Sequence, residues 1–206
     1  MTIKAVIFDI GGVLVRTGDR LPRLKLAERL EMTYAELSAL VFDSPSAVQA
    51  SFGQISEQQH WEVICQALHL PTAEWQTLED EFFAGDRVDM QLVNFLRSLH
   101  PRYRTGIISN GWSSVRPALT EKWKIGEAFD EIIISAEVGL AKPDPRIFEL
   151  AITRLNIAPA EAVFVDDFLE NVEAARNFGL NAIRFLDPAQ TMAEVEQLLE
   201  QTDGTN

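Results

Sequence analysis

Short apolar runs rich in β-branched and aromatic residues recur along this chain, and helical patterns lie between the later ones. The runs cover residues 5–8, 105–108, 131–134, 162–165 and 181–185. Runs that stay apolar over several consecutive positions, instead of alternating with polar ones, are typical of strands in a parallel sheet covered on both faces. They therefore predict a single buried sheet that forms the centre of the protein.

The segments between the later runs carry apolar residues at helical spacing. Residues 146–155 place Ile147, Leu150, Ala151 and Leu155 on one face, and residues 170–178 and 191–201 show similar stripes. Gly179 follows the second of these segments and is a predicted C-cap. Strands that alternate with helices imply right-handed crossovers, so we expect an α/β fold built on a doubly wound parallel sheet.

One connection is too long to be a simple crossover. Between residues 16 and 89 the strand pattern disappears, and helical patterns cover residues 24–30, 34–42, 57–68 and 72–83, with Thr72 as a predicted N-cap. The sequence thus predicts a core of residues 1–15 and 90–206 and a helical insert of residues 16–89. Because the insert follows the first strand, we expect it to cover the catalytic edge as a lid. The alternative is that the insert has only a structural role and does not cover the site.

Composition narrows the class of protein. The 206 residues carry a net charge of −13, with a sequence pI of about 4.6, which argues against nucleic-acid or anionic-membrane partners. No apolar run approaches the ~20 residues that span a bilayer, and no secretory signal is visible, so a cytoplasmic location is expected. The one cysteine, Cys65, lies in an apolar helical run and is expected to be a buried thiol. The sequence leaves the oligomeric state open.

Asp9 ends the first apolar run, and Gly11 and Gly12 follow it closely. Ligands bind outside the carboxyl ends of strands in parallel sheets, so this carboxylate is a candidate functional group. A carboxylate that attacks phosphorus forms an acyl phosphate, which water then hydrolyses. The glycines let the backbone turn tightly, and the Gly11 carbonyl then has room to face a metal ion. A capping or turn aspartate is the alternative reading of Asp9.

Asp166 and Asp167 follow the apolar run 162–165. Two adjacent carboxylates repel each other unless a cation joins them, and oxygen ligands beside a phosphoryl group favour Mg²⁺. Since successive side chains of a strand point in opposite directions, one aspartate should bind the metal while the other orients the site. Asn171, in the first turn of the next helix, is a candidate to hold the loop. A surface turn is the alternative.

Two further features fit a phosphate site. Ser109 and Asn110 follow the second run, where a hydroxyl and backbone N–H groups can hold phosphate oxygens, although both residues are also common helix caps. Lys142 lies in a loop stiffened by two prolines. Its ammonium group, together with Mg²⁺, would balance the charge of Asp9, Asp166 and Asp167 before a phosphate dianion binds.

In this order, the motifs resemble those of the haloacid dehalogenase-like hydrolase superfamily. The matching segments are residues 8–14, 108–111, 139–148 and 164–172. The resemblance implies a Rossmann-like core with an alpha-helical cap, and it places the first and fourth strands side by side. It also implies that Asp9, the Gly11 carbonyl and Asp167 bind Mg²⁺, with Asp166 in support. The branch it resembles most holds sugar-phosphate phosphatases and the phosphatase domain of soluble epoxide hydrolases.

Gly11 departs from the family pattern. Phosphatases of this family usually carry a second aspartate two residues after the nucleophile, where it protonates the leaving group and later activates water. Such general acid–base help contributes ~10²–10⁴-fold to the rate. Three explanations stand side by side: a replacement from the insert, with Arg16, Thr17 and His60 as candidates; a substrate with a good leaving group; or a slow or inactive enzyme.

Three functions are therefore compatible with the sequence. The first is a Mg²⁺-dependent phosphatase that hydrolyses a small phosphorylated metabolite through an aspartyl-phosphate on Asp9. A sugar phosphate is the substrate class that the resemblance suggests. The second is a 2-haloacid dehalogenase, whose members lack the same second aspartate and need no metal; the pair Asp166 and Asp167 speaks against it. The third is a binding or regulatory protein that retains the fold without catalysis.

Overall fold

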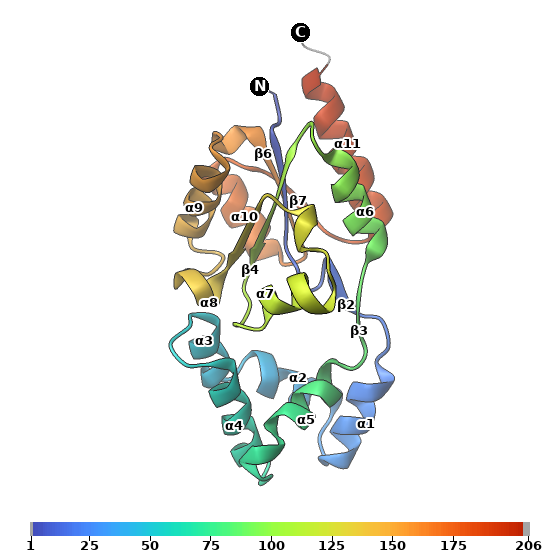
Figure 1. Ribbon diagram of the computed structural model, residues 1–206, viewed down its shortest axis with the longest axis vertical. Coiled ribbons are helices and arrows are strands. Elements are labelled where there is room, and N and C mark those ends of the chain that lie inside the picture. The colour runs from blue at the N-terminus through green and yellow to red at the C-terminus, as the bar shows by residue number, and fades with distance from the viewer. Residues whose placement is uncertain (1, 204–206) are drawn as a thin grey trace.

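A five-stranded parallel sheet forms the centre of the core in the computed structural model, which describes residues 2–203 (Figure 1). Residues 1 and 204–206, the two ends of the expected core, lie outside this range. The spatial order of the strands is β5 (Glu131–Ile134), β4 (Arg104–Ser109), β1 (Ala5–Phe8), β6 (Ala162–Asp166) and β7 (Asn181–Arg184). The first and fourth strands of the expected series, β1 and β6, are neighbours, as the resemblance implied.

The register of the strands aligns their carboxyl ends. Phe8 at the end of β1 pairs with Ile107 of β4 on one side and with Val165 of β6 on the other. Asp9 and Asp166, each one residue further along, therefore leave the sheet at the same level. This alignment of main chains is what brings residues far apart in the sequence to one edge.

Helices cover both faces of the sheet, which confirms the doubly wound α/β fold. On one face, α6 (Met90–Leu99) and α11 (Pro188–Asp203) bury Leu96 and Val195 against the strands. On the other face, α9 (Pro145–Leu155) and α10 (Leu169–Phe178) form a second apolar cluster. Gly179 ends α10 in the left-handed conformation, with φ 108°, as expected of its C-cap position.

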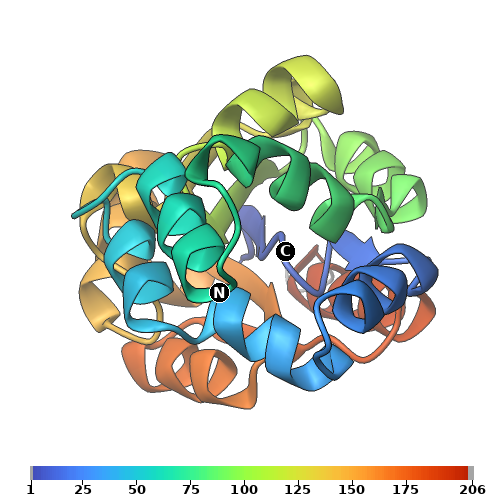
Figure 2. The same cartoon turned by 90° about the horizontal axis from the view of Figure 1, so that it is seen from below.

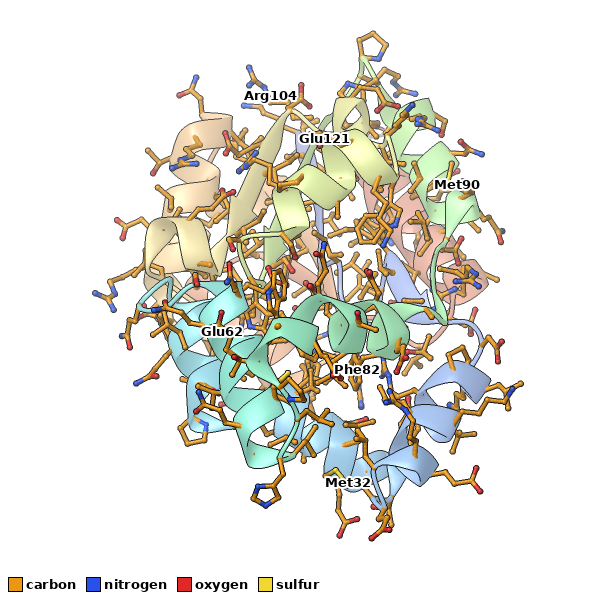
Figure 3. The ribbon with its side chains drawn as sticks, turned by 60° about the horizontal axis from the view of Figure 1, so that its bottom comes forward. Met32, Glu62, Phe82, Met90, Arg104 and Glu121 are labelled. Atoms are coloured by element: carbon orange, nitrogen blue, oxygen red, sulfur yellow. The ribbon has the colours of Figure 1, made fainter. Side chains whose placement is uncertain are left out.

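A group of helices between residues 18 and 85 lies beneath the carboxyl edge of the sheet (Figures 1 and 2). They are α1 (Leu21–Arg29), α2 (Tyr34–Phe42), α3 (Pro45–Ser51), α4 (Glu57–Ala67) and α5 (Trp75–Phe83). They share a hydrophobic cluster of their own, centred on the fully buried Trp61 and Phe82. In Figure 3, Phe82 and Met32 lie on the side of the molecule opposite Arg104, the first residue of β4.

The structure corrects the expected insert in three places. The short antiparallel strands β2 (Val15–Thr17) and β3 (Asp86–Val88) frame it, although their charged residues hid any strand pattern. Helix α3 lies between two of the expected helices, in a segment where no helix was expected; Ser44 is its N-cap and Pro45 its first residue. Thr72 is not the N-cap of the last helix, since it lies in a 3-10 turn before α5.

Cys65 is buried in the cluster of the insert, and burial raises the pKa of its thiol, in agreement with the expected inert thiol. Within residues 2–203, no helix has both the length and the apolar character needed to cross a membrane. The remaining short helical segments are η1 (Thr72–Glu74), α7 (Val115–Pro117), η2 (Ala118–Lys122), η3 (Gly126–Ala128), α8 (Ser135–Val138) and η4 (Pro159–Glu161).

Candidate active site

The ammonium group of Lys142 joins two of the expected site residues. Its Nζ lies 2.9 Å from Asp9 Oδ1 and 2.6 Å from Asp166 Oδ2, and it also donates a hydrogen bond of 2.9 Å to the carbonyl of Ile108. All three side chains are almost completely buried. A buried ion pair is stable only when its hydrogen bonds are satisfied, and here each charge has at least one such partner.

The two oxygens of Asp9 have different surroundings. Oδ1 takes the ion pair with Lys142 and a hydrogen bond of 2.6 Å from the backbone N–H of Ile10. Within the part of the chain that the structure describes, Oδ2 accepts no hydrogen bond. Burial raises the pKa of Asp9 to about 6, against the opposing effect of Lys142 and with a further rise from Asp166. The carboxylate is therefore still ionised at neutral pH, with one oxygen oriented and the other available.

The paired aspartates at the end of β6 also differ from each other. Asp166 is fully buried and accepts hydrogen bonds from the Asn171 side chain, at 3.0 and 3.2 Å, and from the backbone of Phe168, at 2.9 Å. Asp167 has a buried Oδ1 that lacks any partner among the described residues. Burial, followed by repulsion from Asp166, raises the pKa of Asp167. One aspartate is thus saturated by the protein, and the other is left with an unused oxygen.

The three carboxylates are arranged in a way that suits a divalent cation. One oxygen each from Asp9, Asp166 and Asp167 lie within 4.8 Å of one another. Gly12, at φ 78°, approaches Asp167 so closely that a Cβ there would lie 2.3 Å from Asp167 Oδ2, so any side chain at this position would displace the carboxylate and strain the backbone. The unpartnered Oδ1 of Asp167 and this close approach fit the oxygen-only donor set that Mg²⁺ takes.

The structure gives Asn110 and Ser109 different surroundings. The Asn110 side chain donates to the carbonyl of Lys142 at 2.7 Å and accepts from its backbone N–H at 2.8 Å, so both of its polar groups position the lysine. The hydroxyl of Ser109 makes no hydrogen bond with any described residue and is the freer of the two. Ser135, which the sequence did not single out, accepts a hydrogen bond of 3.1 Å from the N–H of Gly111.

Gly11 lies in open space, and none of the proposed replacements is available as a proton donor. An added Cβ at Gly11 would meet no atom within 4 Å. Arg16 forms an ion pair with Asp89, and the Thr17 hydroxyl donates to Asp86 at 2.8 Å. His60 is completely buried in the insert, where both ring nitrogens are engaged, by Ser46 at 2.9 Å and by the Val41 carbonyl at 3.0 Å. Burial lowers the pKa of His60, so the expectation that it could serve as an acid was wrong.

Sequence reasoning missed a contact between the insert and the loop of residues 110–114, which follows β4 and which we call the catalytic loop. Trp112, two residues after Asn110, packs into the cluster of the insert, with its ring 4.8 Å from that of His60. Ser114 donates two hydrogen bonds to the buried carboxylate of Glu57, from its N–H at 2.9 Å and from its hydroxyl at 2.8 Å. A lone tryptophan and a serine in a loop carry no periodic signal, so no sequence pattern could have indicated this contact.

Comparison with known proteins agrees with the fold and the order of the motifs. Residues 3–179 match the model of the haloacid dehalogenase-like hydrolases. The chain belongs to this hydrolase family. It is 28% identical over 203 residues to a sesquiterpene phosphatase from Aspergillus oryzae, which covers 96% of this chain and 97% of that protein. It is also 34% identical over 100 residues to bifunctional epoxide hydrolase 2 from Rattus norvegicus, which covers 47% of this chain.

The match to the rat protein covers 18% of its length, and a match to another curated relative covers 7%, so only segments of these proteins correspond to this chain. Among solved structures, a family enzyme from Bacteroides thetaiotaomicron in complex with magnesium and inorganic phosphate superposes with a TM-score of 0.76 at 19% identity. The superposition covers 92% of this chain and 98% of that one. At this identity, the comparison establishes a shared fold.

Proposed function

We propose that this hydrolase is a Mg²⁺-dependent phosphatase that acts on a small phosphomonoester through an aspartyl-phosphate on Asp9. The main support is the asymmetry of Asp9: Lys142 and a backbone N–H hold one oxygen, and the other is unpartnered beside two more carboxylates. The phosphatase relative that matches the chain almost end to end gives independent support.

In the first step, Asp9 Oδ2 attacks phosphorus, and the bond between phosphorus and the leaving oxygen breaks, with its electron pair going to that oxygen. Water then attacks the same phosphorus, the bond to Asp9 breaks, and the carboxylate is restored while the proton of the water passes to a phosphate oxygen. Lys142 keeps Asp9 oriented throughout and offsets negative charge as it develops. In this proposal the hydroxyl of Ser109, which has no partner among the described residues, donates to a phosphate oxygen.

Asp9, Asp167 and the carbonyl of Gly11 are the groups that would hold Mg²⁺, with Asp166 supporting them through Lys142 and Asn171. When bound, the cation offsets the charge of the carboxylates and of the phosphate. Without it, three carboxylates face one ammonium group, and a phosphate dianion would be repelled. The unpartnered oxygen of Asp167 is the feature of this chain that best supports such a role.

The helical insert of residues 16–89 is, in this proposal, a cap over the core of residues 1–15 and 90–206. Its helices lie beneath the carboxyl edge that carries Asp9, and its aromatic cluster receives Trp112 from the catalytic loop. A cap in this place excludes bulk water while the acyl phosphate forms and contacts the leaving group.

The dehalogenase alternative shares the nucleophile but leaves the three carboxylates without a purpose, because halide displacement needs no metal. The binding-protein alternative leaves the buried ion pair between Lys142 and Asp9 unexplained, because such a pair contributes little to stability compared with apolar packing. Gly11 is compatible with phosphatase activity that is slower for alcohol leaving groups, which depart best with a proton, than for leaving groups that need none.

The direct test is phosphate release from p-nitrophenyl phosphate, whose leaving group needs no acid. Wild type should turn it over with Mg²⁺ and stop in excess EDTA. Asp9→Asn should lower kcat by at least about 10³-fold, because the nucleophile is lost. A wild type that releases no phosphate with Mg²⁺ would refute the proposal, and chloride release from 2-chloropropionate in EDTA would replace it with the dehalogenase function.

A further inference from the structure

Three aromatic rings form a partly exposed surface where the insert meets the catalytic loop. They belong to Phe42 at the end of α2, Phe83 at the end of α5 and Trp112, and we call this surface the aromatic face. The ring centroids of each pair are 6.1 to 6.4 Å apart, and Phe42 stacks on Trp112 at 23°. Phe42 is 46% exposed. Phe83 and Trp112 are partly buried. A cluster of partly exposed aromatic side chains is a candidate binding surface.

The aromatic face lies next to the catalytic edge of the sheet. Trp112 is two residues after Asn110, whose side chain holds the backbone of Lys142, and two residues extend at most about 7 Å. Strand β4, which leads to this loop, pairs with β1, which leads to Asp9. The loop that carries Trp112 therefore begins at the same edge of the sheet as Asp9, on the side where the insert lies.

The polar groups in contact with these rings are already engaged within the protein. Arg23 lies 5.8 Å from the centre of the Phe42 ring and 6.0 Å from that of Phe83. Its guanidinium donates to the carbonyl of Phe82, to the hydroxyl of Tyr34 and to Asp86. His60 uses both of its nitrogens inside the insert. The hydroxyls of a sugar need donors and acceptors in such a wall, and an apolar group needs only contact area.

Resting on the proposed phosphatase function, we infer that the alcohol half of the substrate is apolar and lies on the aromatic face. Its chemical class is an aromatic or isoprenoid alcohol, and a polyhydroxylated sugar fits this face less well because the polar groups that touch the rings are already engaged within the protein. Phe42, as the most exposed of the three rings, is a specificity-determining residue.

Three substrates separate this inference from the function on which it rests. Acetyl phosphate is too small to need the aromatic face and reports on the chemistry alone. Benzyl phosphate and D-ribose 5-phosphate both release a primary alcohol, so they differ mainly in the polarity of that alcohol. We expect kcat/KM for benzyl phosphate to exceed that for ribose 5-phosphate by about 10- to 100-fold, the effect of burying one ring.

Two variants of Phe42 and one matched control assign the preference to the aromatic face. Phe42→Ser should lower kcat/KM for benzyl phosphate by about 10-fold and leave acetyl phosphate unchanged, while Phe42→Leu, which stays apolar, should lose less than about threefold. Val63 is another exposed apolar residue of the insert, with 45% exposure, and Val63→Ser should change neither rate. Calorimetric binding of benzylphosphonate relative to methylphosphonate, with Mg²⁺ present, should show the same ordering without catalysis.

The outcomes are distinct for the two proposals. If acetyl phosphate is not hydrolysed in a manner that depends on Asp9, the phosphatase function fails. If it is hydrolysed but ribose 5-phosphate equals or exceeds benzyl phosphate, the function stands and the inference about the aromatic face is overturned. The inference is also overturned if Val63→Ser weakens benzyl phosphate as much as Phe42→Ser does.

Discussion

The edge of the sheet and the insert beneath it hold their charged groups in opposite ways. At the edge, the ammonium of Lys142 is surrounded by carboxylates and a carbonyl, and hydrogen bonds fix each partner. In the insert, the guanidinium of Arg23 lies among aromatic rings and has one carboxylate partner, Asp86. The difference separates two tasks: the edge places charges for chemistry, and the insert offers an apolar surface whose shape can vary without disturbing those charges.

The largest expected effect comes from removing the charge at the edge. Lys142→Met leaves Asp9 and Asp166 buried without a counter-charge, so we expect a loss of about 3–5 kcal/mol in the free energy of unfolding, together with loss of activity. Urea denaturation followed by circular dichroism measures the first. Saturating Mg²⁺ should restore part of the stability, since the cation replaces the missing charge.

The matched control is a surface ion pair that likewise joins a basic side chain to a carboxylate. Arg154 lies 3.0 Å from Glu131 and is exposed, so Arg154→Met should cost less than about 1 kcal/mol. If Lys142→Met and Arg154→Met destabilise the protein equally, the contrast between the edge and the rest of the molecule is wrong.

The next effect concerns the open space at Gly11. Gly11→Asp places a carboxyl group where an added Cβ meets no atom, and we expect kcat/KM for poor leaving groups such as benzyl alcohol to rise by about 10²-fold. Acetyl phosphate, whose leaving group needs no proton, should gain little. Steady-state kinetics with both substrates measures the difference.

Gly11→Asn is the control, because it has the same shape but supplies no proton, and it should give no gain. Gly12→Ala, one residue away, should instead disrupt the site, since its Cβ would collide with Asp167 and its φ of 78° disfavours any side chain. An equal gain from Gly11→Asn would show that the effect is not acid–base catalysis.

The smallest expected effect lies where the insert meets the catalytic loop. Burial, followed by the neighbouring carboxyl group of Glu57, raises the pKa of Glu79 to about 8. In the folded protein Glu79 therefore keeps a proton that the unfolded chain releases near pH 4.5, so stability falls as pH rises from about 4.5 to 8. Glu79→Gln, which mimics the protonated form, should remove this contribution.

Thermal denaturation at pH 5 and at pH 8 tests this expectation. Relative to wild type, Glu79→Gln should gain about 2–4 °C more at pH 8 than at pH 5, as expected for ~1 kcal/mol in a protein of this size. A shift of the same size at both pH values would contradict a titrating pair.

The sequence predicted the sheet and its edge well, for a physical reason. Runs such as 162–165 are buried on both faces, so nearly every position must be apolar, and the first polar residues, Asp166 and Asp167, mark the strand end. In a parallel sheet the carboxyl ends of all strands lie along the same edge, so residues that follow different strands meet there. The positions of Asp9, Lys142 and Asn171 follow from this rule together with the family resemblance.

The contacts of the insert could not be predicted in the same way. The burial of His60, and the packing of Trp112 against it, depend on how several short helices meet, and no periodic pattern encodes that meeting. Strand β2 escaped detection because two of its three residues, Arg16 and Thr17, are polar and partly exposed. Nor did the sequence indicate that Asn110 would use its whole side chain to hold Lys142.

The short ribbon of β2 and β3 has a consequence for how this protein can change. Val15 pairs with Val88 and Thr17 with Asp86, so the chain departs from the sheet and returns to it at neighbouring points. The residues between these points form an inserted segment whose two ends are held together by the pairing of β2 with β3. Such a segment can be exchanged as a unit, by recombination or in the laboratory, while the core and its nucleophile stay the same. The exchanged insert could then bind a different class of alcohol.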